Sequence, residues 1–194
     1  MHASGDRLSL LGRVVAALEN AAVSHALIGA AAMAAHGVSR ATVDLDVLVV
    51  APACLDPGLW SSLRAQGVAV DLRRGDDSDP LAGVVRFAAA GERPVDLVVG
   101  KGTWQRSALA RAEPGRFAGV DLPILRAADL VLLKLYAGGP QDRWDIAQLL
   151  AAGDHGALSE EIELRLPDLP PEAAALWRSL QPPRSMGSPA LGSG

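Results

Sequence analysis

The sequence predicts an α+β fold, in which a small mixed sheet flanked by helices precedes a helical C-terminal part. Short apolar and β-branched segments alternate with helical patterns up to Thr103, and helical periodicity dominates after it. Hydrophobic residues make up 49% of the 194 residues and charged residues 21%, which is enough apolar material for one sizeable core. We expect a sheet of about four or five strands.

The N-terminal part predicts a helix, a strand and a second helix. Apolar residues recur at helical spacing over 7–20, and the apolar run 25–28 predicts a strand. A tight turn at Gly29 then leads into an alanine-rich helix. Gly37 ends this helix, because glycine commonly follows the last helical residue.

The middle of the chain predicts the remaining strands. The run 43–50, VDLDVLVV, is typical of a central strand and would carry Asp44 and Asp46 on one face. The other elements expected here are a helix over 56–65, a loop over 73–80, and strands over 68–72, 84–88 and 95–99.

The rest of the chain predicts helices. Helical periodicity is expected over 104–112, 127–136, 141–150, 160–164 and 172–180. We therefore divide the chain into a core domain over 1–124 and a helical subdomain over 125–180. The tail over 181–194 is rich in Pro, Gly and Ser and is predicted to be disordered.

Charge and cysteine content restrict the partners and the compartment. The formal net charge of −4 and the pI near 5.5 argue against a broad basic surface for nucleic acid. The single Cys54 excludes an internal disulfide and fits a reducing cytoplasm. The uncharged stretch 20–39 is interpreted as buried rather than membrane-spanning, and no secretory signal is visible. We expect a cytoplasmic protein with no membrane partner.

Three aspartates carry the chemistry that the sequence suggests. Asp44 and Asp46 are two residues apart in the predicted central strand, so their carboxylates can converge on one metal ion or on two. Buried carboxylates are costly unless they are paired or bind a cation. Asp96 is a third carboxylate flanked by apolar residues, in a strand that can lie beside the first. Such a set is suited to phosphoryl or nucleotidyl transfer.

At these residues the sequence resembles the nucleotidyltransferase superfamily with the polymerase-β-like fold. The pattern of that family is a Gly-Ser or Gly-Gly turn, a helix, an acid-x-acid strand and a third acid between apolar residues. The matching segments here are Ile28-Gly29-Ala30, Asp44-Leu45-Asp46 and Val95-Asp96-Leu97.

Two longer stretches resemble small bacterial members of this superfamily, among them the abortive-infection toxin type. One is 36–49, HGVSRATVDLDVLV. The other is 132–150, LLKLYAGGPQDRWDIAQLL, which is similar to the second signature of that group, a lysine on a helix followed by Asp-x-x-Asp. The resemblance covers about residues 25–150.

The resemblance implies a role for each matched residue. Asp44 and Asp46 would hold two Mg²⁺ ions together with an NTP, and Asp96 would complete the site and help to deprotonate the attacking hydroxyl. Gly29 would let the backbone approach the phosphates. Lys134 would contact the β or γ phosphate as a point charge.

Four further polar residues join the expected nucleotide site. Arg40 and Thr42 precede the acid pair and offer a cation and a hydroxyl to phosphate oxygens. Asp142 and Asp145 share a helix face and would orient Lys134 or the acceptor. Structural alternatives stay open: Arg40 would pair with an acid, the two aspartates would lie on a solvated face, and Lys134 would extend to the surface.

Ala30 departs from the family pattern, in which serine commonly follows the glycine. A hydroxyl contact is lost while the backbone donor remains, so a slow or degenerate enzyme is compatible with the sequence. The expected function is transfer of a nucleotidyl group from an NTP to an acceptor, with release of pyrophosphate.

The acceptor is left open by the sequence. A tRNA end, a protein side chain and a small hydroxylated antibiotic are all compatible with the resemblance. The alternative from another class is a non-catalytic partner protein that binds the cognate toxin or antitoxin of a toxin–antitoxin pair.

Overall fold

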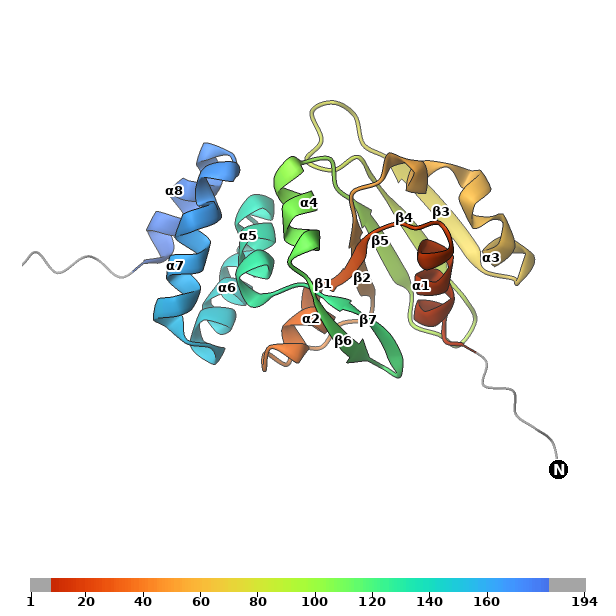
Figure 1. Cartoon of the computed structure of the whole chain (residues 1–194), viewed down its shortest axis with the longest axis horizontal. Helices are drawn as coiled ribbons and strands as arrows, with labels where there is room; N and C mark the ends of the chain where they lie inside the picture. Colours follow the sequence, from red (N-terminus) through yellow and green to blue (C-terminus); the bar gives the residue numbers. More distant parts are fainter. Residues whose placement is uncertain (1–7, 182–194) are drawn as a thin grey trace, which may run out of the picture.

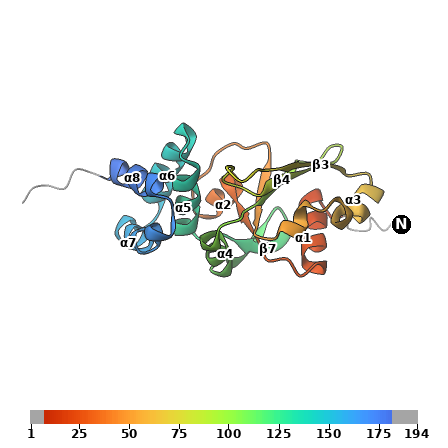
Figure 2. The same cartoon turned by 90° about the horizontal axis from the view of Figure 1, so that it is seen from above.

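The computed structural model describes residues 8–181, and the predicted disordered tail, except for Gln181, lies outside them. The sheet and its covering helices occupy one side of the molecule, and α5 to α8 lie together at the other (Figure 1). Figure 2 shows the same division from above. Within the described residues, no helix combines the length and the apolar character that a bilayer crossing requires.

The described strands form one seven-stranded mixed sheet. Their bounds are β1 (His25–Ile28), β2 (Leu45–Val49), β3 (Ala69–Arg74), β4 (Gly83–Ala88), β5 (Val95–Val99), β6 (Glu113–Phe117) and β7 (Val120–Ile124). The order along the sheet is β3-β4-β5-β2-β1-β7-β6, so β2 is central, as the sequence predicts. β2 is parallel to β5 and β1 is parallel to β7, whereas the other neighbours are antiparallel.

The helices occur close to where periodicity predicts them. Their bounds are α1 (Leu10–Asn20), α2 (Gly29–Ala35), α3 (Ser61–Ala65), α4 (Thr103–Ala110), α5 (Ala127–Ala137), α6 (Pro140–Ala152), α7 (His155–Arg165) and α8 (Pro171–Leu180). Short 3₁₀ turns are η1 (Pro52–Leu55), η2 (Pro57–Trp60) and η3 (Leu166–Asp168). The helix predicted over 56–65 is thus divided into η2 and α3.

The outer half of the sheet has one covered and one open face. Buried and half-buried residues alternate along β4 and β5, so Val85, Phe87 and Leu97 face the core while Arg86 and Asp96 face the opposite side. On the covered face, η1 contacts β3, β4 and β5. The open face is therefore the one that carries charge.

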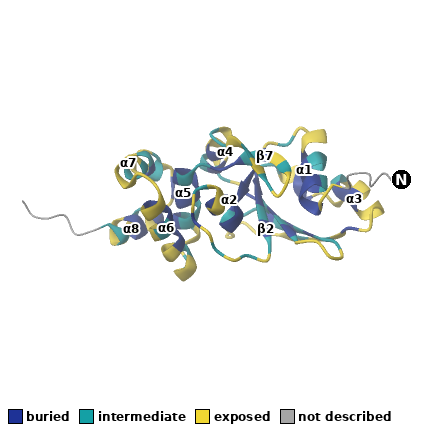
Figure 3. Cartoon of the chain, turned by 90° about the horizontal axis from the view of Figure 1, so that it is seen from below, coloured by how far each residue is buried: buried dark blue, intermediate teal, exposed yellow. Residues whose placement is uncertain are grey.

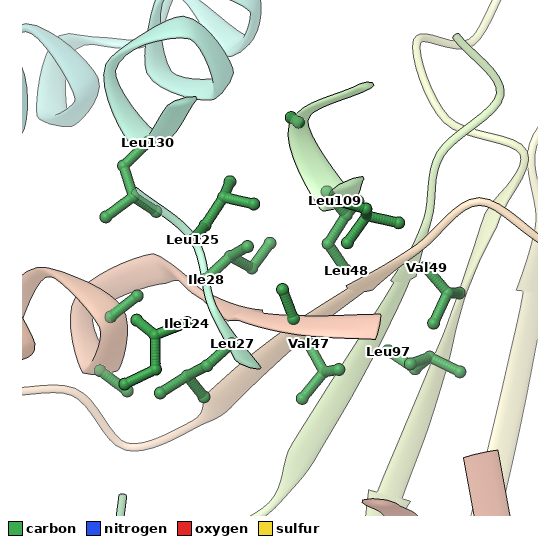
Figure 4. Packing of buried hydrophobic residues seen from close by; sticks show 14 of the residues in the cluster. Leu27, Ile28, Val47, Leu48, Val49, Leu97, Leu109, Ile124, Leu125 and Leu130 are labelled. Atoms are coloured by element: carbon green, nitrogen blue, oxygen red, sulfur yellow. The ribbon is translucent and has the colours of Figure 1, made fainter. Parts of the chain in front are cut away.

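The core is built from aliphatic side chains rather than aromatic ones. Figure 4 shows Leu27 and Ile28 of β1 beside Val47 and Leu48 of β2, with Leu109 of α4 above them. Few aromatic rings meet, and one such pair packs edge to face with ring centroids 4.8 Å apart, Trp60 on Phe87. Buried residues line the interior faces of the helices and exposed ones lie outside (Figure 3). The alanine, leucine and valine content of the sequence thus fills the core.

α5 is the element that joins the helical part to the sheet part. It contacts α6, α7 and α8 on one side and α2 on the other. Asp129, in its first turn, is 1% exposed and accepts hydrogen bonds from the guanidinium of Arg111 at the end of α4. This ion pair therefore connects the two parts across their boundary.

The hairpin β6–β7 corrects the expectation of four or five strands and of a wholly helical region after Thr103. Pro114 and Pro123 hide these strands in the sequence, because proline is tolerated only where a strand needs no N–H donor, as at a sheet edge. The turn is formed by Ala118 and Gly119, both with positive φ (48° and 82°), which suits a two-residue hairpin. Alanine is an unusual residue for that conformation.

The strand predicted over 43–50 is shorter than expected, and Asp44 precedes it. β2 begins at Leu45, whose N–H donates to the carbonyl of Pro94 just before β5. Pro94 has no N–H with which to extend the ladder. Thr42 bends the chain instead, because its hydroxyl donates to the Asp44 carbonyl at 2.9 Å. The loop predicted over 73–80 also starts later, because the residues at 73 and 74 still pair with β4.

We predict that Arg111→Met destabilises the protein by about 3 kcal/mol, because it leaves the buried Asp129 carboxylate without its cation. Urea unfolding measures this cost. The matched control is Arg116→Met, which breaks an exposed pair with Asp121 and should change stability by less than about 0.5 kcal/mol. Equal effects of the two substitutions would contradict the linking role of the Arg111–Asp129 pair.

Candidate active site

The strand register places charged residues in one row across the open face of the sheet. Asp71 of β3 lies opposite Arg86 of β4, Arg86 lies opposite Asp96 of β5, and Asp96 lies opposite Asp46 of β2. Asp46 in turn lies opposite Ile28, the last residue of β1. Directly opposed side chains on the antiparallel pairs β3–β4 and β4–β5 have Cβ atoms about 4.5–5.5 Å apart, and Asp46 and Asp96 are in register on the parallel strands β2 and β5. The row therefore brings distant parts of the sequence into contact distance.

Arg86 bridges two of the predicted site aspartates. Its Nη1 donates to Oδ2 of Asp96 at 2.7 Å and its Nη2 donates to Oδ1 of Asp44 at 2.9 Å. A longer contact of 3.4 Å joins Nη1 to Oδ2 of Asp44. Although Asp44 precedes β2, its carboxylate is thus held beside that of Asp96 by one forked guanidinium.

Asp46 lies against the turn between β1 and α2. Gly29 starts this turn with φ of +64°, a conformation that favours glycine. A Cβ atom at Gly29 would overlap the Asp46 carboxylate, so the close approach of backbone and acid also requires glycine. The structure thus places the Asp46 side chain next to Gly29, and approach of the Gly29 backbone to phosphates stays a prediction.

Burial and mutual repulsion raise the pKa of two of the acids. Desolvation raises the pKa of Asp46, and the charges of Asp96 and Asp44 raise it further, while Lys134 opposes the shift. Desolvation also raises the pKa of Asp96, against the lowering effect of Arg86. A raised carboxyl pKa reflects an unfavourable negative charge, which a cation would relieve.

Lys134 is held by two carboxylates of α6. Its Nζ lies 2.9 Å from Oδ1 of Asp142 and 2.7 Å from Oδ2 of Asp145, and Asp145 has no exposed side-chain surface. Desolvation alone would lower the pKa of Lys134, but the hydrogen bonds to Asp145 and Asp142 raise it above its ordinary value. Two structural alternatives are therefore wrong: Lys134 does not extend to the surface, and Asp145 is not on a solvated face.

Arg40, Thr42 and Ala30 each contact other parts of the protein. Arg40 Nε lies 3.4 Å from Oδ1 of Asp145, so Arg40 does pair with an acid. The Thr42 hydroxyl is used in the bend before β2. Ala30 is buried in the first turn of α2. Contact of these residues with phosphate stays a prediction.

Two cavities flank the charged row. One, of about 320 Å³, is lined by Gly29, Asp46, Lys134 and apolar residues of α5. The other, of about 510 Å³, is lined by residues of β3, of β4 and of the loop that connects these two strands, and Asp96 forms part of its wall. Pro80 and Leu81 line both cavities. The acids thus lie at the boundary between two spaces large enough for small molecules.

The carboxylates of Asp44, Asp46 and Asp96 are chemically suited to bind a divalent cation. Asp44 and Asp96 already converge on one positive group, the guanidinium of Arg86. Oδ1 of Asp96 is buried and has no hydrogen-bond partner among the described residues. Carboxylate oxygens are the ligands that Mg²⁺ prefers. Over residues 8–181, no group of three or more His, Cys, Asp or Glu side chains is already gathered as a metal site.

Sequence reasoning missed three residues of this region. Arg86 contacts the acids, and Tyr136 of α5 and Gln105 of α4 line the smaller cavity. A signal for Arg86 was present, because it is a lone charge in the apolar strand that neighbours Asp96. Tyr136 and Gln105 carry no such signal, since their positions depend on how α4 and α5 pack against the sheet.

We predict that Gly29→Ala destabilises the protein by about 2–3 kcal/mol, from the cost of positive φ plus the overlap with Asp46. Gly67→Ala is the control, because Gly67 has φ of +82° and open space around its Cβ position. The control should cost about 1 kcal/mol. Chemical denaturation of both variants checks the difference, and equal costs would mean that Asp46 does not restrict Gly29.

We predict that Asp145→Asn lowers the pKa of Lys134, because burial remains while one compensating carboxylate is lost. The chain has two lysines, so lysine labelled with ¹⁵N gives two side-chain signals. Lys101→Arg assigns them. Because the pKa of Lys134 is higher in the folded state, its ion pairs stabilise the wild type fully below the unfolded-state pKa of 10.5. This stabilisation is lost as the pH rises through the folded-state pKa of Lys134. An unchanged Lys134 titration in Asp145→Asn would contradict the ion pair.

Comparison with known proteins identifies the fold. No protein-family model and no curated protein sequence matches this chain. Among solved structures, it is similar to the solution structure of the antibiotic-resistance factor ANT(2'')-Ia, with 16% identity, a TM-score of 0.53, and coverage of 88% of this chain and 94% of that one.

The crystal structure of ANT(2'')-Ia in complex with adenylyl-2''-tobramycin gives a similar result. The identity is 16% and the TM-score is 0.52, with coverage of 89% of this chain and 97% of that one. The α+β fold class expected from the sequence is confirmed: the chain has the polymerase-β-like nucleotidyltransferase fold.

Proposed function

We propose that the protein is a metal-dependent nucleotidyltransferase, which moves a nucleoside monophosphate from an NTP to an acceptor hydroxyl and releases pyrophosphate. The observation that carries the proposal is the pairing of Asp46 with Asp96 on the parallel strands β2 and β5, with Asp44 joined to Asp96 through Arg86. These acids lie between two cavities, and Lys134 lines one of them. The similarity in fold to ANT(2'')-Ia supports the proposal.

The NTP is assigned to the smaller cavity, of about 320 Å³. Lys134 supplies a cation there for the β or γ phosphate, and Asp142 and Asp145 hold that cation in place. Leu130 and Leu133 give the cavity apolar walls, which suit the nucleoside. This assignment places the α phosphate near Asp46, between the two cavities.

In the reaction, the acceptor oxygen forms a bond to the α phosphorus while the bond from that phosphorus to the oxygen of pyrophosphate breaks. The acceptor proton passes to the Asp96 carboxylate, whose pKa desolvation raises. Asp44, Asp46 and Asp96 would hold Mg²⁺, which neutralises phosphate charge and lowers the pKa of the attacking hydroxyl.

The acceptor that we propose is a small hydroxylated molecule rather than a tRNA or a protein. The larger cavity, of about 510 Å³, has the size of a small-molecule site, and Asp96 lines it. The net charge of −4 weighs against a polyanionic acceptor such as tRNA. ANT(2'')-Ia, with a similar fold, forms a complex with an adenylylated antibiotic.

We predict that Asp46→Asn abolishes Mg²⁺-dependent NTP binding while the fold is retained, because a metal-ligating carboxylate is lost. Calorimetric titration with each non-hydrolysable NTP, with and without Mg²⁺, measures this. Asp121→Asn is the control, because Asp121 is an exposed carboxylate of the β6–β7 hairpin, remote from the row. Retained metal-dependent binding in Asp46→Asn would contradict the site assignment.

Acceptor identity is tested separately. Wild-type protein, Mg²⁺ and the bound NTP are incubated with a panel of hydroxylated antibiotics, with tRNA, and with a protein mixture, and mass spectrometry detects the added nucleoside monophosphate. A nucleoside monophosphate attached to the small molecule supports the proposal, whereas one attached to tRNA or to protein would identify that macromolecule as the acceptor instead. Failure of the wild type to bind any NTP would favour the non-catalytic toxin–antitoxin partner instead.

A further inference from the structure

Arg86 occupies a position between two carboxylates that the proposed function needs for a cation. Its two terminal nitrogens engage Asp96 at 2.7 Å and Asp44 at 2.9 Å. These contacts use Oδ2 of Asp96 and, with the longer contact from Nη1, both oxygens of Asp44, and they place a permanent positive charge between the two carboxylates. A divalent ion bound by the same oxygens and the guanidinium are therefore mutually exclusive.

Arg86 also has room to leave. Its side chain is 43% exposed and lines the cavity of about 510 Å³. Asp71 is its directly opposed residue on β3, on the side away from Asp96, and lines the same cavity. Asp71 is 60% exposed, and among the described residues its side chain has one ion-pair contact, an exposed one of 3.2 Å with Arg73. Its carboxylate is thus available as a second partner for Arg86.

We propose that Arg86 is a resident counter-ion of the Asp44–Asp96 pair, and that the Arg86 side chain must turn toward Asp71 before a divalent cation binds. The inference rests on the proposed function, since it concerns the same acids. The guanidinium stabilises the site without metal, because otherwise two half-buried carboxylates would repel each other. When a metal ion binds, it replaces the Arg86 guanidinium between Asp44 and Asp96, and the displaced guanidinium pairs with Asp71.

The exchange predicts opposite effects for two substitutions. The apparent metal affinity is the intrinsic affinity multiplied by the fraction of molecules in which the acids are free of Arg86. Removal of the Arg86 guanidinium therefore strengthens metal binding. If about one molecule in ten has Arg86 displaced, Arg86→Gln should bind Mn²⁺ about tenfold more tightly. Asp71→Asn should bind it about threefold more weakly, because the displaced arginine has lost its partner.

The experiment is titration of the full chain with Mn²⁺, monitored by electron paramagnetic resonance of the free ion, without nucleotide. Arg74→Gln is the matched control, because Arg74 lines the same cavity but donates to the Leu55 carbonyl instead of to the acids. It removes one positive charge near the site without freeing a carboxylate. An increase in affinity for Arg74→Gln equal to that of Arg86→Gln would overturn the proposal in favour of general electrostatics.

Arg86→Lys provides a second variant in case the glutamine variant does not fold. A lysine keeps the charge but cannot fork onto two carboxylates, so an intermediate affinity is expected. Thermal unfolding without metal supplies an independent readout, in which Arg86→Gln should unfold at a lower temperature and recover more on addition of Mn²⁺ than the wild type does. A smaller recovery would overturn the proposal.

The outcomes separate this inference from the proposed function. Binding of Mn²⁺ by the wild type with unchanged or weaker affinity in Arg86→Gln overturns the counter-ion role and leaves the function standing. Absence of Mn²⁺ binding in both proteins overturns the proposed function as well. Binding of NTP without metal by the wild type, lost in Arg86→Gln, would show that Arg86 replaces the metal and would also overturn the exchange.

Discussion

The parallel pairing of β2 with β5 is the constraint on which the site depends. It places Asp46 directly beside Asp96, although the two residues are fifty positions apart in the sequence. One residue of slip would turn either carboxylate toward the core, because side chains alternate between the faces of a strand. The buried Val47 and Leu97, which share this register, make such a slip costly. The hydrophobic core therefore fixes the position of the acids.

A second consequence of that register is a concentration of negative charge that the fold has to offset. The cations come from three different elements: Arg86 from β4, Lys134 from α5, and Arg40 from the segment after α2. Each pairs with an acid of another element. These ion pairs thus join β4 to β5 and to the segment before β2, α5 to α6, and the segment after α2 to α6, and the same contacts hold the site residues in place.

The sequence predicted the elements that hydrophobic periodicity encodes and the acids that stand out from it. β1 was predicted to the residue, and the strands expected over 84–88 and 95–99 correspond to β4 and β5. The hairpin β6–β7 was not, because proline and a positive-φ alanine conceal it. Asp44, Asp46, Asp96 and Gly29 were all found in the region predicted for them.

What the sequence did not provide was the pairing among the charged residues. Nothing in the order of residues says that Arg86 lies between two aspartates or that Asp145 holds both Lys134 and Arg40. These contacts depend on strand order and on the packing of α5 and α6. Tertiary geometry, rather than spacing along the chain, decides which charges meet.

The wall that separates the two cavities also has a consequence for selectivity. Pro80 and Leu81 line both spaces, and the Tyr136 hydroxyl of α5 donates to the Pro80 carbonyl at 3.0 Å. Because the two cavities share these lining residues, the shape of a molecule bound on one side of the acids would affect which molecule fits on the other.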